Sequence, residues 1–284
     1  MNTKQAAQAH SNDAVDPSHS TTPAPKRPNV PDVFEEIRSF VADYERTHHT
    51  QTSWREPVIG IAAADNPLFP TLKTLICNTH ALPGDLVPGA KSVIAFFIPF
   101  DESVAKSNIT GELSSPEWMA AYGDTNAVIT ALTQHLYDVL TEAGYHASNL
   151  PPTYNYDEVN LCSDWSHRSV AYIAGVGTFG INHMLITPAG CCGRIGSVVT
   201  DLELPPTPML KEELCLFKRK GTCGACMRRC VVGAFTTNDD EVAFNVRACN
   251  TQINEKVYQN RPQLGGDSCG KCMVGVPCST KAPA

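Results

Sequence analysis

Cysteine placement constrains the fold of this chain more than any other feature of its sequence. The chain has twelve cysteines among 284 residues, and eight of them lie in its last quarter. These eight are Cys215, Cys223, Cys226, Cys230, Cys249, Cys269, Cys272 and Cys278. The N-terminus lacks the basic start and apolar core of a secretory signal, so we expect a reducing, cytoplasmic location. Clustered cysteines in such a compartment more often bind metal than form disulfides.

The spacing of these cysteines predicts two four-iron clusters. The segment "TCGACMRRC" (222–230) has the C-x2-C-x3-C ending of a two-cluster ferredoxin run, although Lys220 stands where the first thiol is expected and Val231 where a proline is expected. The nearest upstream thiol is Cys215, and the longer interval costs little loop-closure entropy. In such ferredoxins the fourth cysteine of each run binds the other cluster. The predicted ligand sets are therefore Cys215, Cys223, Cys226 and Cys278 for one cluster, and Cys230, Cys249, Cys269 and Cys272 for the other.

Structural zinc is the alternative for the same cysteines. Two C-x2-C pairs with further thiols nearby also suit tetrahedral zinc sites. The C-x2-C-x3-C ending is not a feature of zinc ribbons, and it favours the interpretation as two [4Fe-4S] clusters.

The remainder of the chain predicts a mixed α/β body. Residues 1–30 are rich in small polar residues and proline, so we expect a disordered tail there. We expect an α/β domain at 31–205 and a cysteine-bearing domain at 206–284, with the linker "PPTP" at 205–208. Periodicity and turn residues predict helices at 31–44, 67–80, 124–145 and 163–175, and strands at 57–64, 92–100, 182–188 and 196–204.

Composition argues against several classes of function. Hydrophobic residues make up 42% of the chain, enough for a substantial core. The net charge of -7 gives no electrostatic case for binding nucleic acid, and no apolar run reaches the roughly 20 residues of a membrane helix. A basic patch at 217–220, Arg228 and Arg229 can offset cluster charge, dock an acidic electron donor, or be a solvated face.

The segment "GVGTFG" (175–180) matches the glycine pattern of dinucleotide-binding sites. Such a site needs a strand before the glycines and a helix after them. The following "INHMLITP" is β-rich and stops at Pro188, so we do not expect a dinucleotide there. These glycines are better explained by close approach of a flat ligand or of a neighbouring element.

The same segment carries a family resemblance. "AGVGTFGINHMLITPAG", followed by "GSVVTDLELPP" and the two cysteine runs, resembles a short form of the epoxyqueuosine reductase family, and more distantly the catalytic core of reductive dehalogenases. The resemblance covers about residues 90–278, and Phe179 and Ile181 depart from it. The matching positions are Ala174, Gly175, Gly177, Gly180, Asn182, Leu185, Pro188, Thr200, Asp201, Leu202 and Leu204.

The resemblance implies a nitroreductase-like body that binds base-off cobalamin, followed by a ferredoxin-like module with two [4Fe-4S] clusters. A low-potential donor of the flavodoxin or ferredoxin type would supply electrons for removing oxygen or halide from a small or nucleoside-type substrate. The helical repeats with which the queuosine enzymes bind tRNA do not follow Cys278, so we do not expect a tRNA partner. Predicted cofactor-binding residues are Arg168, Gly175, Gly177, Gly180, Asn182 and Thr200.

Candidates for proton transfer lie upstream of the glycine segment. Asp124 is the nearest match to the family's proton-donor motif, with a helix N-cap as the alternative role. His167 can act as an acid near pH 7 or hydrogen-bond a corrinoid amide, and a structural role is the alternative. Tyr122 and Tyr172 are possible proton donors or core aromatics.

The four remaining cysteines divide into two pairs. The adjacent Cys191 and Cys192 can offer a redox thiol or a cobalt ligand, or act as small apolar residues. Cys77 and Cys162 have no partner in any metal-binding spacing, and we expect them to be structural thiols.

Two other functions stay open from the sequence alone. One is a two-cluster electron-transfer protein that docks a partner enzyme and binds no corrinoid. The other is a flavin-dependent reductase, because nitroreductase-like folds resemble the cobalamin domain.

Overall fold

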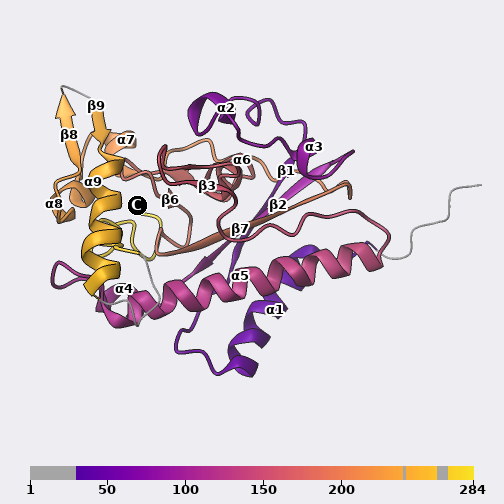
Figure 1. Ribbon diagram of the computed structural model, residues 1–284, viewed down its shortest axis with the longest axis horizontal. Coiled ribbons are helices and arrows are strands. Elements are labelled where there is room, and N and C mark those ends of the chain that lie inside the picture. Colours follow the sequence, from indigo (N-terminus) through magenta and orange to yellow (C-terminus); the bar gives the residue numbers. More distant parts are fainter. Residues whose placement is uncertain (1–29, 239–240, 261–267) are drawn as a thin grey trace, which may run out of the picture.

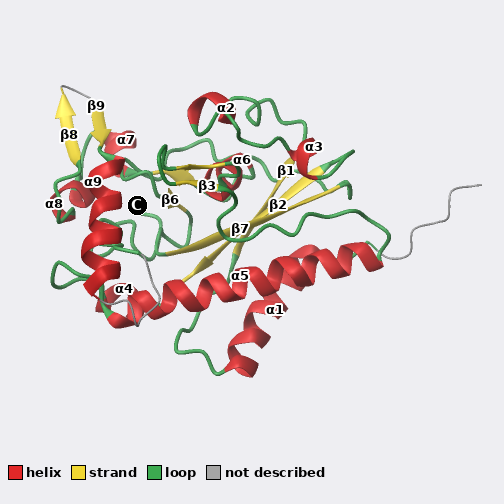
Figure 2. Cartoon of the chain, viewed as in Figure 1, coloured by secondary structure: helices red, strands yellow, loops and turns green. Residues whose placement is uncertain are grey.

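A computed structural model describes three stretches of the chain, which form a mixed α/β molecule (Figure 1). These stretches are residues 30–238, 241–260 and 268–284. The tail predicted to be disordered at 1–30 lies outside them except for Val30. A small sheet with covering helices makes up most of the molecule, and the cysteine-bearing elements gather at one end (Figures 1 and 2). Within the three stretches, no helix has the length and apolar character needed to span a membrane.

A three-stranded antiparallel sheet forms the centre of the body. Strand β2 (Ser92–Pro99) lies between β1 (Val58–Ala63) and β7 (Gly193–Thr200). All eight residues of β2 are buried, because both faces of the sheet are covered. The strands predicted at 57–64 and 92–100 are confirmed.

Two helices cover one face of this sheet. Helix α1 (Val33–His48) begins at Asp32, whose side chain accepts hydrogen bonds from the backbone N–H groups of the first turn. Helix α5 (Pro116–Glu142) runs along the sheet beside α1 (Figure 1). Their apolar faces pack on the even-numbered residues of β2, in a core that contains Val33, Ile37, Val41, Ile94, Phe96, Ile98, Val128, Ile129, Leu132, Leu136 and Leu140.

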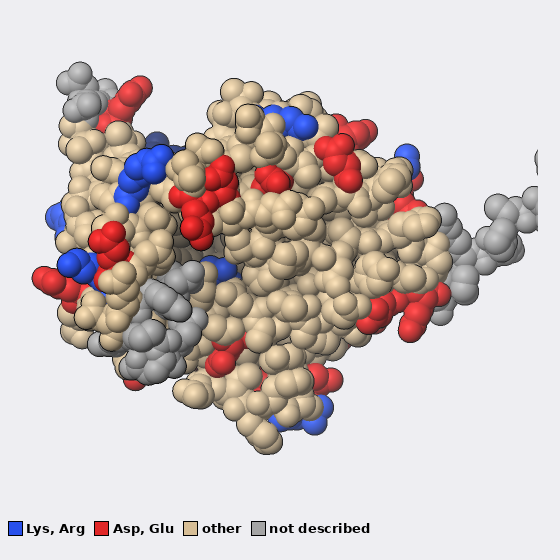
Figure 3. All heavy atoms as spheres, viewed as in Figure 1, with Lys and Arg blue, Asp and Glu red and all other residues tan. Residues whose placement is uncertain are grey.

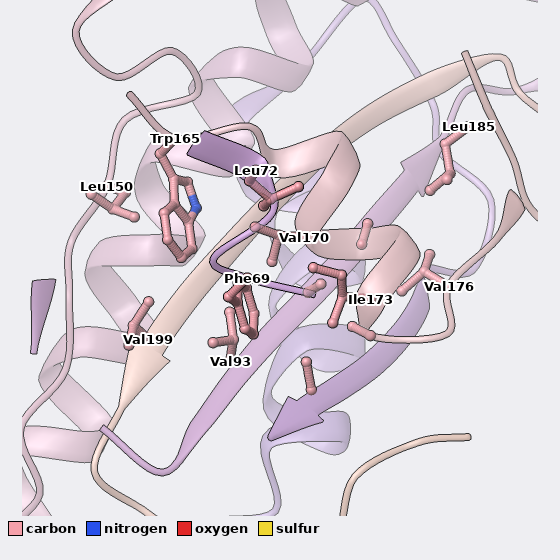
Figure 4. Close-up of a cluster of buried hydrophobic side chains, with 14 of the residues drawn as sticks. Phe69, Leu72, Val93, Leu150, Trp165, Val170, Ile173, Val176, Leu185 and Val199 are labelled. Carbon is pink, nitrogen blue, oxygen red and sulfur yellow. The ribbon is translucent and has the colours of Figure 1, made fainter. Parts of the chain in front are cut away.

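Three shorter helices contribute to a second apolar core on the opposite face, and Figure 4 shows many of its side chains. They are α2 (Leu72–Leu75), α3 (Pro83–Leu86) and α6 (His167–Ile173). Trp165, just before α6, stacks on Phe69 with ring centroids 6.3 Å apart. The odd-numbered residues of β2 and β7 point into this core, among them Val93, Ala95, Phe97 and Val199.

Helix α5 starts eight residues earlier than the sequence predicts. Ser115 is its N-cap and accepts a hydrogen bond from the backbone N–H of Trp118, and Pro116 occupies the first turn. The interpretation of Asp124 as an N-cap is therefore wrong. The helix continues through Gly123 because burial of Trp118 and its neighbours outweighs the low helix propensity of glycine.

Two predicted elements are much shorter than expected. Only Leu72–Leu75 (α2) of the helix predicted at 67–80 is helical, because the preceding residues form turns that begin at Asn66. The strand predicted at 182–188 is limited to β6 (Leu185–Ile186), which forms a hairpin with β5 (Thr178–Phe179). No helix follows the glycines within 174–192, as expected from the argument against a dinucleotide site.

Short elements build the cysteine-bearing end. They are α7 (Leu216–Lys220), α8 (Ala225–Arg229), β8 (Phe235–Asn238), β9 (Glu241–Phe244), α9 (Val246–Thr251) and the π-helical turn η1 (Gln252–Tyr258). The body contributes three further short elements, α4 (Glu102–Ser107), β3 (Tyr156–Asp157) and β4 (Cys162–Ser163).

The segment expected to be a linker lies along the edge of the sheet. The backbone N–H of Thr207 donates to the carbonyl of Ile61 at 2.8 Å, and the Thr207 hydroxyl accepts from the Ile61 N–H at 3.0 Å. Residues 205–208 therefore pack against β1.

The C-terminal segment is fastened to the body. The backbone N–H groups of Cys191 and Cys192 each donate to the carbonyl of Ser279 at 3.0 Å. The guanidinium of Arg55 donates to the carbonyl oxygens of Phe100, Ala189 and Thr280 at 2.8–2.9 Å. One arginine thus joins three segments that are distant in sequence.

The structure pairs Cys77 with Cys162 in a disulfide, with Cα atoms 5.8 Å apart. This pairing agrees with the expected structural role, although the sequence did not indicate that the two cysteines pair with each other. The two cysteines are 85 residues apart, and no sequence motif relates them. The packing of the α2 region against the β3–β4 hairpin brings them together.

Candidate functional site

Four of the predicted metal ligands surround one pocket. Cys215 is the N-cap residue of α7, Cys223 precedes α8, Cys226 lies in the first turn of α8, and Cys278 belongs to the C-terminal segment. The pocket is small, with a cavity volume of about 20 Å³. The fold thus brings together the four cysteines that the spacing assigned to one cluster.

A left-handed turn aims two of these thiols. Cys223 has a φ of 110° and Gly224 a φ of 63°. Glycine suits position 224, since a φ of 63° lies in the left-handed region that strains residues with a Cβ atom. Arg228, from the predicted basic patch, donates to the carbonyl of Cys223 at 2.8 Å and holds the turn.

Burial opposes ionisation of the thiols in this pocket. Burial and the neighbouring thiols of Cys278 and Cys215 raise the pKa of Cys226 to about 12. A hydrogen bond with Cys191, followed by burial, also raises the pKa of Cys278. Because metals bind cysteine as the thiolate, a positively charged metal group is what would stabilise four sulfurs gathered in this way.

The other four predicted ligands are also neighbours. Cys230 follows α8, Cys249 lies in α9, and Cys269 and Cys272 flank Lys271. Burial, with the thiols of Cys269 and Cys230, raises the pKa of Cys249 to about 11. Burial and the thiols of Cys249 and Cys269 raise the pKa of Cys272. The backbone N–H of Ala234 donates to the Cys230 sulfur at 3.3 Å.

In the parts of the chain that the structure describes, no three His, Cys, Asp or Glu side chains are grouped closely enough to hold one metal ion. A tetrahedral zinc ion places its sulfur ligands roughly 3.8 Å apart. A four-iron cluster binds each thiolate through a different iron atom, so its ligands lie farther apart. Both metal interpretations stay predictions, and iron content distinguishes them.

A buried lysine lies between two cysteines of the second set. Lys271 is 1% exposed, and its Nζ atom donates to the carbonyls of Asn108 and Thr110 at 2.9 and 2.8 Å. Arg229 adds hydrogen bonds to the carbonyls of Lys271 and Ile109 at 3.2 and 2.6 Å. No pattern in the sequence predicts the burial of this lysine, because a lysine beside cysteines is usually a solvated charge.

Cys191 and Cys192 are buried beside the first set. Both sulfurs lie near the carbonyl of Met273, at 3.7 and 3.3 Å. The Cys191 thiol also hydrogen-bonds Cys278, which places it at the edge of the first cysteine set. Their burial agrees with the alternative role as small apolar residues, and a redox role stays a prediction.

Two arginines lie where the body meets the cysteine-bearing end. Figure 3 shows the surface hollowed at this junction, with basic side-chain atoms inside the hollow. Burial and the nearby Arg194 lower the pKa of Arg168, although part of its side chain is exposed to solvent. Arg168 donates to the carbonyl of His183 at 2.8 Å and interacts electrostatically with Cys249 of the second set.

Arg194, at the start of β7, was not singled out from the sequence. Its guanidinium carbon lies 4.0 Å from the ring centroid of Tyr122, and its Nε donates to the side-chain oxygen of Asn126 at 3.1 Å. Both partners are on α5. The site therefore combines residues of α5, α6 and β7 with the second cysteine set, a grouping that only the tertiary structure creates.

His167 has a fully occupied ring. Its Nδ1 lies 2.8 Å from the hydroxyl of Ser197 and its Nε2 lies 3.0 Å from the carbonyl of Pro151. A carbonyl can only accept, so Nε2 donates to it and Nδ1 accepts from Ser197. Burial lowers the pKa of His167 to about 4, so the ring is neutral near pH 7. These contacts favour the structural role over the catalytic one.

The remaining proton-transfer candidates have protein partners. Asp124 is half-buried in α5 and accepts a hydrogen bond from the hydroxyl of Thr52 at 2.8 Å. Its catalytic role stays a prediction. Tyr172 packs on the core with its ring centroid 5.7 Å from that of Phe179, which agrees with the alternative of a core aromatic.

Most residues predicted to bind cofactor contact protein in the structure. Cβ atoms on Gly175 and Gly177 would lie 2.5 Å from the carbonyl of Pro208 and 2.2 Å from that of Ile186. Close approach of neighbouring elements thus accounts for both glycines. The sequence left this explanation open beside that of a flat ligand. Gly180 packs against the side chain of Asn182. A Cβ atom on Gly180 would lie 2.6 Å from the Oδ1 atom of Asn182.

Two further predicted cofactor residues are buried. Asn182 donates to the carbonyl of Cys272 at 3.2 Å, and Thr200 donates to the carbonyl of His146 at 2.8 Å. The contact of Asn182 joins the glycine segment to the second cysteine set. The cofactor roles of these residues stay predictions.

Comparison with solved structures identifies proteins of the same fold. An epoxyqueuosine reductase in complex with an epoxyqueuosine-modified tRNA-Tyr stem loop matches with a TM-score of 0.54 and 18% identity over 87% of this chain and 66% of that one. Epoxyqueuosine reductase from Bacillus subtilis matches with a TM-score of 0.52 and 17% identity, covering 88% and 67%. A catabolic reductive dehalogenase gives 0.52 and 17%, covering 80% and 30%.

The fold is similar to that of epoxyqueuosine reductases and reductive dehalogenases. The resemblance in the sequence is thus confirmed at the level of the fold. No family model matches the chain, and no curated protein is similar enough to count as a relative. The chain spans just under two thirds of the first reductase and less than a third of the dehalogenase.

Proposed function

We propose that this chain is an iron–sulfur, cobalamin-dependent reductase, which removes oxygen or halide from a small or nucleoside-type substrate. One observation carries the proposal: a fold similar to epoxyqueuosine reductase gathers Cys215, Cys223, Cys226 and Cys278 around one pocket. The spacing of the cysteines in the sequence assigns these four to a single cluster. Cys230, Cys249, Cys269 and Cys272 would hold the second cluster.

The donor sets fit the two clusters. Each cluster needs four thiolates, and all eight cysteines required lie at one end of the molecule (Figure 1). The N–H of Ala234 donates to the sulfur of Cys230, the kind of contact that tunes a cluster potential. When bound, the clusters would supply electrons at low potential.

The surface is hollowed where the body meets the cysteine-bearing end (Figure 3). Arg168 interacts electrostatically with Cys249, so a corrinoid held by Arg168 would adjoin the second cluster. Arg168 would hold polar groups of the corrinoid through its forked donors. The bound cobalt would supply a strongly reducing centre that cleaves a carbon–oxygen or carbon–halogen bond.

The overall reaction needs two electrons and at least one proton. Replacing a halide by hydrogen consumes two electrons and one proton and releases the halide ion. Removing an epoxide or hydroxyl oxygen as water consumes two protons. Tyr122, on the face of α5 that meets Arg194, is the proposed proton source. A flavodoxin- or ferredoxin-type protein would supply the electrons.

The test is anaerobic purification of the chain with cobalamin supplied, followed by iron, sulfide and cobalt analysis and EPR spectroscopy. We expect about eight irons and one cobalt per chain, since two four-iron clusters accompany one corrinoid. The cobalt(II) spectrum should have the base-off form. Eight irons with no cobalt retained after reconstitution would leave an electron carrier. A yellow chromophore released on denaturation would indicate a flavin enzyme, and zinc in place of iron would contradict the cluster assignment.

A further inference from the structure

Arg194 has donors that no protein group uses. Its Nε is bound to Asn126 and its guanidinium face lies on the ring of Tyr122. Among the described residues, its two Nη atoms have no hydrogen-bond partner, and they are not among the buried polar atoms that lack one. They therefore reach solvent at the junction of body and cysteine-bearing end.

The charge around Arg194 is unbalanced. Arg194 lies close enough to Arg168 for its charge to contribute to lowering the pKa of Arg168. In the described stretches, neither arginine forms an ion pair with a carboxylate. Two neighbouring cations that lack a carboxylate partner are stabilised when an anion binds between or beside them.

The guanidinium of Arg194 is held in one orientation. The hydrogen bond from Nε to Asn126 fixes one edge, and the contact with Tyr122 fixes the plane, so the fork formed by the Nη atoms needs little ordering when it binds. Such a fork matches the two oxygens of a carboxylate or phosphate.

We propose that Arg194, oriented by Tyr122 and Asn126, is an anion-binding subsite that takes a carboxylate or phosphate group. The anion comes either from the substrate, which would then be an acidic compound, or from the phosphodiester of the corrinoid. This inference adds a property of the substrate to the proposed function. Only the identity of the ligand rests on the proposed function, since the anion site itself involves only residues of the body.

The first experiment measures binding of benzoate and of inorganic phosphate to the purified chain by calorimetry, for the wild type and for Arg194→Gln. The variant should bind at least roughly tenfold more weakly, because hydrogen bonds to a charged partner are lost. Arg194→Lys keeps the charge without the fork and should recover phosphate binding more than benzoate binding. Arg46→Gln, on the exposed surface of α1, is the matched control and should leave binding unchanged.

A second experiment separates the two sources by cobalamin retention. If Arg194→Gln retains cobalt like the wild type but loses benzoate binding, the anion belongs to the substrate. If the variant loses cobalamin as well, and cobinamide without its phosphodiester binds equally to both proteins, the anion belongs to the corrinoid. Equal binding of both anions to folded wild type and folded Arg194→Gln would overturn the inference. A wild type that binds anions but never cobalt would contradict the proposed function and leave the anion site standing.

Discussion

At the scale of residues, the structure separates polar groups that are satisfied from those that have donors to spare. His167 and Arg194 both lie near the junction of α6 and β7, but they differ in how many of their nitrogen atoms have protein partners. The histidine has partners for both ring nitrogens, whereas the arginine uses only its Nε. A buried group whose partners are all protein stabilises the fold, and a group with accessible donors is available for a ligand.

The neutral state of His167 predicts an acid-sensitive fold. Its folded pKa of about 4 lies below the unfolded value of 6.5, so the unfolded state binds the extra proton first. The stabilising contribution is complete above pH 6.5 and is lost as the pH falls towards 4, by about 3 kcal/mol for a shift of this size. Thermal unfolding of wild type and His167→Gln between pH 7 and 4 checks this. The wild type should lose more stability than the variant, and parallel curves would contradict the prediction.

At the scale of elements, α5 connects the body to the cysteine-bearing end. Its first turn packs Trp118 against the segment that carries the second cysteine set, and the indole Nε1 donates to the hydroxyl of Ser268 at 3.1 Å. Just before α5, the hydroxyl of Ser114 donates to the carbonyl of Ser268 at 2.6 Å. Gly270 fits this junction because a Cβ there would lie 2.1 Å from the indole. The long helix thus supports both the sheet and the cysteines.

We expect Gly270→Ala to disrupt this junction. The methyl group would overlap Trp118, and the φ of 66° is strained for alanine, so the free energy of unfolding should fall by about 2–4 kcal/mol. The second cluster should be lost more easily than the first. Thermal melts and iron analysis measure both effects. The matched control is Gly84→Ala, where a Cβ meets no atom within 4 Å.

The N-cap of α5 provides a second prediction at this scale. Ser115→Ala should lower the free energy of unfolding by about 1 kcal/mol, since the Trp118 N–H loses its acceptor. Asp124→Asn should leave the helix start unaffected, because Asp124 lies well inside α5 and Asn keeps an acceptor for Thr52. Chemical denaturation of both variants tests this, and a larger loss for Asp124→Asn would contradict the observed start of the helix.

At the scale of the whole molecule, each cysteine set contains three cysteines from one run of the sequence and a fourth from the other run. Cys230 follows Cys226 in the chain but lies with Cys249 and Cys269 in space, and Cys278 lies in the pocket of the first set. The C-terminal segment reaches that pocket because Arg55 and the backbone of Cys191 and Cys192 fasten it to the body.

This exchange predicts which variants resemble one another. Cys230→Ser should lose about four irons per chain and give the same residual EPR spectrum as Cys249→Ser, because both remove a ligand from the same four-iron cluster. Cys226→Ser and Cys278→Ser should form the other matching pair. Cys77→Ser, outside both sets, is the control and should keep the full iron content. A spectrum of Cys230→Ser that matches Cys226→Ser would show that each sequence run binds its own cluster.

The sequence by itself determined the local features of this protein. Apolar periodicity was enough to predict α1, most of α5, and the strands β1 and β2, because burial of a helix face or of a central strand leaves its pattern in neighbouring residues. Cysteine spacing predicted a grouping of the eight thiols, since a cluster draws three of its ligands from one short loop, and four of them line one pocket. The family resemblance pointed to the fold that the solved structures share.

Only the tertiary structure decided the contacts between distant segments. The start of α5 depended on the packing of Trp118, and the pairing of Cys77 with Cys162 depended on loops that meet in space. The surroundings of Arg194 and Lys271 come from segments 68 and 163 residues away, respectively. Charge interactions and hydrogen bonds depend on distances in space, so the order of residues along the chain does not reveal them.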